Sequence, residues 1–128
     1  MQITQERYGS TVVLALSGRI DNSTNDGLKA GLEPHVAGCR SGGDRLILNF
    51  AKVDYISSVG LRVLMLTAKQ IREQGGTIVV AALQPVVREI FEISRFNLVF
   101  QCFASVRDAL AKISPPGDLA EHESTHGA

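Results

Sequence analysis

The chain has 128 residues, of which 45% are hydrophobic and 20% are charged, and its 13 Lys and Arg are balanced by 13 Asp and Glu. This length fits one globular domain, and no apolar run approaches the ~20 residues that a membrane-spanning helix needs. The balanced charge and the 5% aromatic content argue against a nucleic-acid-binding surface.

The first residues, MQITQERYGS, lack the charged and then apolar pattern of a signal peptide, so we expect a soluble cytoplasmic protein. Cys39 and Cys102 are isolated in the sequence, with no Cys-x-x-Cys pair. This pattern favours reduced thiols over a disulfide or a zinc site.

The N-terminal part predicts a hairpin followed by a helix. Weak alternation over residues 3–8 and an apolar run over 12–16 predict two strands. Ser23 and Asp26 have the spacing of a capping box, so we expect a helix that begins near Thr24. Apolar residues then recur at helical spacing, at Leu28, Leu32 and Val36.

The central part predicts a buried strand and then a well-marked helix. Residues 45–50 are nearly all apolar, which is typical of a strand buried on both faces. From Ser58 the period changes to that of a helix, which Gly75 and Gly76 close. One apolar stripe runs along it: Leu61, Leu64, Met65, Ala68 and Ile71.

The C-terminal part repeats this alternation. We expect a strand over 77–82, a helix that begins near Pro85, a last strand over 98–103 and a helix that begins near Ser105. After Ser114 there is little to bury.

The order of elements predicts an α/β fold with a mixed, mostly parallel sheet of four to five strands and about four helices. We expect one domain over residues 1–113 and a disordered tail over 114–128.

Functional residues in open α/β sheets gather beyond the carboxyl ends of the parallel strands. Residues 17–22 and 54–60 follow two such strands, so Asp21 and Ser58 are expected at one end of the sheet. Ser58 suits a helix N-cap, and a phosphate on it would meet the positive end of the helix. Capping and modification therefore both remain open for Ser58.

The helix after Ser58 carries a second apolar stripe formed by Val59, Val63 and Leu66, with Arg62 beside it. The stripe fits either a helix packed between the sheet and a neighbour or a surface that docks a partner.

A hydrolase that used Ser58 as nucleophile would need a base such as His. His35 falls in the first helix, whereas His122 and His126 fall in the tail. There is no glycine-rich phosphate-binding motif, and we expect no metal and no cofactor. Asp21 and Asp54 could serve as metal ligands or phosphoacceptors, but isolated acids at strand ends are more often cap or turn residues.

Three segments together resemble the STAS family of anti-sigma factor antagonists: LSGRID at 16–21, LILNF at 46–50 and VDYISSVGLRVL at 53–64. The resemblance runs from about Ile3 to Ile113 and is most specific from Asp54 to Leu64.

The resemblance implies a protein that is not an enzyme and that acts in a partner-switching circuit. It would bind an anti-sigma factor that is also a serine kinase, be inactivated when that kinase phosphorylates Ser58, and be reset by a serine phosphatase. Where the family has Asp-Ser-Ser-Gly this chain has Ser57-Ser58-Val59-Gly60, so Ser57 is the second candidate acceptor.

The partner surface implied by the resemblance comprises Asp21, Asn25, Asp54, Ser57, Ser58, Gly60, Leu61 and Arg62. No direct contact with nucleic acid or membrane is expected, and self-association is left open. The alternative is a small cytoplasmic STAS subunit of a lipid-transporting ABC system, because the fold by itself does not settle function.

Overall fold

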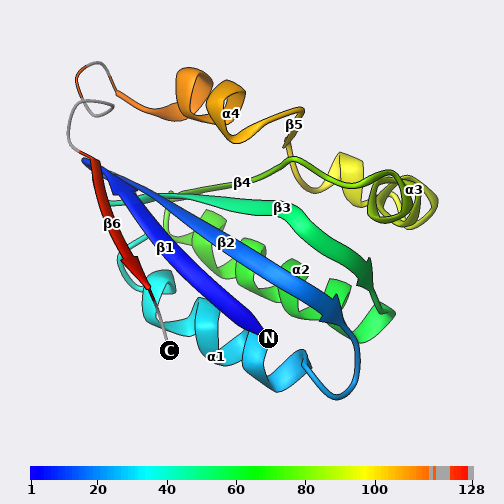
Figure 1. Cartoon of the computed structure of the whole chain (residues 1–128). Helices are drawn as coiled ribbons and strands as arrows, with labels where there is room; N and C mark the ends of the chain where they lie inside the picture. Colours follow the sequence, from blue (N-terminus) through cyan, green and yellow to red (C-terminus); the bar gives the residue numbers. More distant parts are fainter. Residues whose placement is uncertain (116, 118–121, 127–128) are drawn as a thin grey trace.

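The computed structural model describes residues 1–115, 117 and 122–126. The elements of these residues, drawn in Figure 1, are β1 (Gln2–Tyr8), β2 (Thr11–Ile20), α1 (Asn25–Val36), β3 (Arg45–Ile56), α2 (Ser58–Glu73), β4 (Thr77–Ala81), α3 (Pro85–Ile93), a 3-10 turn η1 (Phe96–Leu98), β5 (Cys102–Phe103), α4 (Val106–Ile113) and β6 (His122–His126).

The strands form one mixed sheet in the order β5-β4-β3-β2-β1-β6. The pairs β2–β3, β3–β4 and β4–β5 are parallel, while β1 is antiparallel to both β2 and β6. Strands β1–β5 and helices α1–α4 confirm the expected α/β fold with its mostly parallel sheet.

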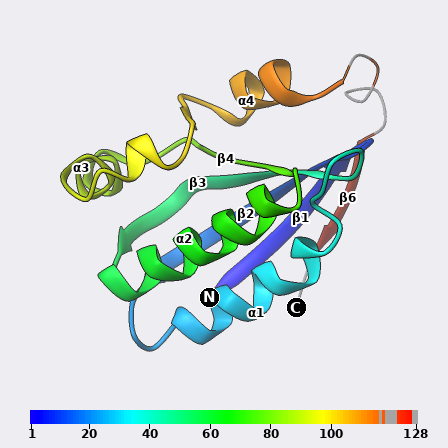
Figure 2. The same cartoon turned by 180° about the vertical axis from the view of Figure 1, so that it is seen from behind.

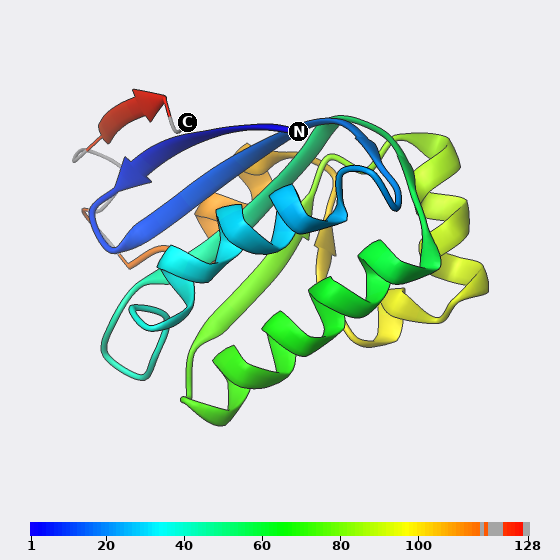
Figure 3. The same cartoon turned by 90° about the horizontal axis from the view of Figure 1, so that it is seen from below.

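Helices cover both faces of the sheet. Helices α1 and α2 lie side by side on one face, whereas α4 lies on the other, as Figures 2 and 3 show from two further sides. The larger core fills the space between the sheet and α1, α2 and α3, with Leu14, Leu48 and Phe50 fully buried. The smaller core under α4 contains Val13 and Ile47. Strands β2 and β3 are therefore buried on both faces, which explains their apolar runs.

The structure corrects the expected bounds of two strands. Strand β2 runs to Ile20 and β3 to Ile56, several residues beyond the apolar runs at 12–16 and 45–50. Their pairing continues through polar residues because the parallel ladder is made by backbone groups, with irregular steps between Ala15 and Ser17 and between Gly18 and Arg19.

The last strand of the predicted domain is shorter than the expected 98–103. Phe96 and Phe100 bury their rings beside Phe91, with ring centroids 5.7 and 6.4 Å from that of Phe91. The chain reaches this packing through η1, so only Cys102 and Phe103 extend beside β4.

The expected disordered tail lies partly outside the described residues, which lack 116, 118–121, 127 and 128. Within the described part the structure differs from the expectation, because His122–His126 form β6 along β1. A sheet edge offers unpaired backbone N–H and C=O groups, so a polar segment can pair there without burying apolar side chains.

Cys39 and Cys102 are both free thiols. Burial raises the pKa of Cys39 to about 11, so this thiol stays protonated at neutral pH. Among the described residues, no helix combines the length and apolar character needed to cross a membrane.

Candidate functional site

The parallel register of β2 and β3 brings two strand ends together. Arg19 lies opposite Tyr55 and Ile20 opposite Ile56. Immediately beyond, the Ser57 backbone N–H donates to the Ile20 carbonyl oxygen over 2.8 Å. The loop after β2 and the start of α2 therefore share one end of the sheet, as expected for Asp21 and Ser58.

The cap of α2 is Ser57, so of the two roles left open for Ser58 the structure assigns capping to its neighbour. Ser57 has extended backbone angles, and its Oγ accepts a hydrogen bond from the Gly60 N–H at 3.2 Å. Ser58 is the first helical residue and is exposed. The Ser57 hydroxyl is thus engaged in the helix cap, while the Ser58 side chain is exposed to solvent.

The expected capping box at the start of α1 is also corrected. Thr24 occupies the N-cap position but makes no capping bond with its side chain. Instead, Thr24 Oγ1 accepts from the Asp21 N–H at 2.9 Å and donates to the Arg19 carbonyl oxygen at 2.7 Å. These bonds fold the β2–α1 loop back onto the end of β2.

Asp21 is the centre of a polar cluster at this end. Its Oδ1 accepts from the Ser23 hydroxyl at 2.7 Å and from the Ser23 N–H at 2.9 Å, and its Oδ2 accepts from Arg19 Nε at 3.1 Å. These bonds, led by that of the Ser23 hydroxyl, lower the pKa of the Asp21 carboxyl. Asp21 is therefore a charged turn residue with its oxygens already engaged.

Sequence reasoning did not assign Arg19 and Tyr55 to the site. The Arg19 guanidinium lies 4.1 Å from the centroid of the Tyr55 ring, in the geometry of a cation–π contact. Together with Ser57 and residues 21–23 they line a shallow depression. The sequence does show a basic residue near the end of one predicted strand and an aromatic residue near the end of the next. Whether the two side chains meet depends on the register between the strands, which the sequence alone does not give.

Gly60 allows α2 to approach the strand ends closely. A Cβ at this position would stand 2.6 Å from Ile20 Cγ2 and 3.0 Å from Ile56 Cγ1. Leu61 is buried in the main core. Both residues therefore face inward, so they cannot contact a partner directly as the resemblance implied.

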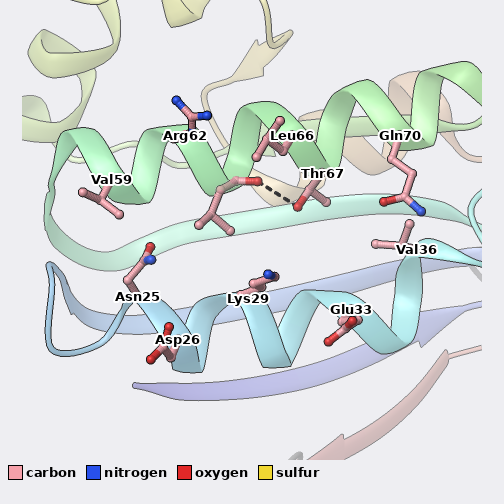
Figure 4. A pocket seen from close by; sticks show the side chains of 11 residues that line it. Asn25, Asp26, Lys29, Glu33, Val36, Val59, Arg62, Leu66, Thr67 and Gln70 are labelled. Carbon is pink, nitrogen blue, oxygen red and sulfur yellow. Dashed lines mark hydrogen bonds between the residues drawn. The ribbon is translucent and has the colours of Figure 1, made fainter.

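A groove of about 330 Å³ runs between α1 and α2, as Figure 4 shows. On the α2 side it is lined by the apolar Val59, Val63 and Leu66 and by the polar Arg62, Thr67 and Gln70. Val59 and Leu66 are 42% and 50% exposed. On the α1 side the wall is mostly polar, with Asn25, Asp26, Lys29, Glu33 and Val36. The second apolar stripe predicted from the sequence is therefore only partly covered by the neighbouring helix.

Of the remaining predicted site residues, Asn25 and Arg62 line the groove and Asp54 does not. Arg62 rises from the side of α2 that faces away from α1 (Figure 4). Asp54 is exposed and lies within β3, two residues before the strand ends. The structure thus brings Asp21, Asn25, Ser57, Ser58 and Arg62 to one end of the molecule.

The arrangement does not supply Ser58 with a base from α1. His35 lies in the last turn of α1, ten residues after Asn25 and hence ~15 Å along the helix from the end where Ser58 lies.

Comparisons with known proteins agree with this geometry. The sequence matches the model of the STAS domain over residues 2–109. It is 38% identical over 111 residues to BtrV of Bordetella bronchiseptica, which is named as an anti-sigma factor antagonist, and the match covers 87% of this chain and 92% of that protein.

Solved structures show the same fold. The crystal structure of an anti-sigma factor antagonist from Mycobacterium paratuberculosis has a TM-score of 0.78 at 23% identity, over 88% of this chain and 93% of that one. The phosphorylated form of the Bacillus cell fate determinant SpoIIAA has a TM-score of 0.64 at 18% identity, over 87% of this chain and 98% of that one. With a family match that spans most of its length and a fold that agrees, the chain belongs to the STAS domain family.

Proposed function

We propose that this protein is an anti-sigma factor antagonist that binds a kinase-type anti-sigma factor in the cytoplasm and is inactivated by phosphorylation of Ser58. The observation that carries the proposal is the different environment of two adjacent serines: Ser57 caps α2, while Ser58 is exposed beside the α1–α2 groove. The 38% identity to BtrV supports the antagonist role.

In the proposed reaction the protein is a substrate and not an enzyme. The kinase transfers the γ-phosphoryl group of ATP to Ser58 Oγ, the hydroxyl proton leaves, and ADP is released. A serine phosphatase then hydrolyses the phosphoserine to serine and inorganic phosphate. No cofactor of the antagonist itself takes part.

Phosphorylation would break the complex through desolvation. The phosphate adds about −1.5 to −2 charges where a partner had met a small hydroxyl. Burying a poorly paired charge at an interface costs several kcal/mol, and ~1.4 kcal/mol is a tenfold change in affinity. The penalty is large enough to separate partners that bind the unmodified form.

The proposed partner surface surrounds Ser58. It uses six of the residues that the resemblance implied: Asp54, Ser58 and Arg62, which are exposed, and Asp21, Asn25 and Ser57, which are half-buried. The side-chain oxygen of Asn25 is itself buried, without a hydrogen-bond partner among the described residues. Gly60 and Leu61 contribute by holding the start of α2 against the sheet, because both are buried.

A pull-down with the unmodified full chain, in the presence of ATP or ADP, tests the partner. We expect recovery of a protein that phosphorylates this chain. Recovery of a transport ATPase together with its permease would instead support the role of a transporter subunit and would overturn the proposal.

Mass spectrometry after incubation with the recovered kinase and ATP tests the acceptor. We expect phosphate on Ser58 in the wild type and in Ser57→Ala, and none in Ser58→Ala, which should bind the kinase constitutively. Ser58→Asp should fold normally and bind weakly. Phosphate that maps to Ser57, or equal affinity of the modified and unmodified chains, would contradict the mechanism.

A further inference from the structure

Ser58 and Arg62 are one helical turn apart on α2, at positions i and i+4. Residues with this spacing lie on the same side of a helix, about 5–6 Å apart at their Cβ atoms. Both side chains are exposed. An acidic group at the first position and a basic group four residues later is also the favourable order for an ion pair on a helix.

The Arg62 guanidinium has no ion pair or hydrogen bond among the described residues, where the ion pairs are Arg7–Asp44 and Arg19–Asp21. The first turn of α2 contains no acidic residue. Arg62 is therefore an unengaged cation one turn from the proposed acceptor.

Arg19, a second basic residue near the start of α2, is already engaged. It pairs with Asp21 at 3.1 Å and lies over the Tyr55 ring. It also lines the depression that contains Ser57. A phosphate on Ser57 would therefore lie beside Arg19. A phosphate on Ser58 would instead lie one helical turn from Arg62.

We propose that Arg62 is the internal counter-charge of phosphorylated Ser58, its guanidinium binding the phosphate oxygens across one turn of α2. Guanidinium N–H groups bind phosphate oxygens through charge-assisted, commonly bidentate hydrogen bonds. This inference rests on the proposed function for the identity of the acceptor and adds the residue that receives the charge.

The pairing has a consequence for the groove. Arg62 borders the α1–α2 groove, and its side chain rises from the side of α2 that faces away from α1, where it is available to a partner that covers α2. Once it holds the phosphate it is no longer available there. Phosphorylation therefore alters two partner contacts together: the Ser58 hydroxyl becomes a dianion, and the charge of Arg62 is neutralised by it.

The test is a phosphorus NMR titration of the full chain that carries phosphoserine at position 58, installed through an expanded genetic code. We compare the wild-type background with Arg62→Gln and with Lys69→Gln. Lys69 is the matched control, because it lies on the same exposed side of α2 but ~16 Å from Ser58, beyond the ~10 Å screening length at 0.1 M salt.

We expect the second pKa of the phosphate to be about 0.15–0.4 unit lower in the wild-type background and in Lys69→Gln than in Arg62→Gln, with the difference shrinking as salt is raised. Arg62→Lys should retain part of the difference. All variants share the same helix N-terminus, so its contribution to the phosphate pKa cancels when the variants are compared.

Equal phosphate pKa values in the wild-type and Arg62→Gln backgrounds would overturn the proposal. A phosphate pKa that rises as much in Lys69→Gln as in Arg62→Gln would also overturn it. Circular dichroism on each sample verifies that the fold is retained. Because the phosphoserine is installed without a kinase, this result is independent of the acceptor mapping above. Phosphate found on Ser57 would overturn the proposed function without changing the titration.

Discussion

The Ser57 hydroxyl oxygen accepts a hydrogen bond from the Gly60 N–H at 3.2 Å, and this bond separates the roles of two adjacent serines. Ser57 satisfies one of the free amides at the start of α2. Ser58, one residue later, is the first helical residue and is exposed.

Ser57→Ala should therefore destabilise the fold more than Ser58→Ala. Loss of an N-cap typically costs about 1 kcal/mol, whereas an exposed serine in the first turn contributes a few tenths. Urea unfolding of both variants, with equal m-values, measures the difference. An equal loss in the two variants would contradict the assignment of the cap.

Gly60→Ala should lower the free energy of unfolding. The new Cβ would stand 2.6 Å from Ile20 Cγ2, and relief of such overpacking in a core costs about 1–3 kcal/mol. That cost exceeds the gain in helix propensity of at most ~1 kcal/mol. Thermal unfolding measures the change.

Gly27→Ala is the matched control in α1. A Cβ there would be 3.8 Å from Met1 Cβ, an ordinary contact, so the substitution should stabilise the protein by about 0.5–1 kcal/mol. Stabilisation by both substitutions would mean that α2 does not approach the strand ends as closely as described.

Asp21 should make stability depend on acid pH. Its pKa is lowered in the folded protein from an ordinary value of 3.8, so the folded state binds the proton less readily than the unfolded state. The stabilisation is fully present above that value and is lost as the pH falls through the folded pKa. The melting temperature should therefore be higher for wild type than for Asp21→Asn at pH 7, and the two values should converge as the pH is lowered to 2.5.

NMR titration of the Asp21 carboxyl carbon identifies the cause of this shift. Ser23→Ala should raise the pKa more than Arg19→Gln, because the Ser23 hydroxyl makes the largest contribution. A larger effect of Arg19→Gln would show that the ion pair dominates.

Removal of residues 115–128 should change the free energy of unfolding by less than ~1 kcal/mol. Strand β6 pairs with β1 alone, and β1 keeps its pairing with β2 along its whole length. Truncation after Ser105 is the contrasting control, because it also removes α4 and uncovers Val13 and Ile47. A large loss in the shorter truncation would show that β6 is a structural part of the domain.

Local patterns in the sequence were enough to predict helices α1–α4 and strands β1–β5, but not η1 or β6. Helices α2 and α3 begin at the expected Ser58 and Pro85, and α4 begins one residue after the expected Ser105. The Ser105 hydroxyl caps this helix by accepting a hydrogen bond from the Asp108 N–H. Periodicity and capping act within a few residues, so a single sequence contains the information they need.

The α/β alternation, the two serines at the start of α2 and the second apolar stripe on that helix could all be read from the amino-acid sequence. Three features required the folded structure: Ser57 and not Ser58 caps the helix, Gly60 and Leu61 face inward, and Arg19 lies over Tyr55. These outcomes depend on the register of β2 against β3 and on how closely α2 approaches their ends. Register and approach arise from packing between residues more than 30 positions apart, which no local pattern contains.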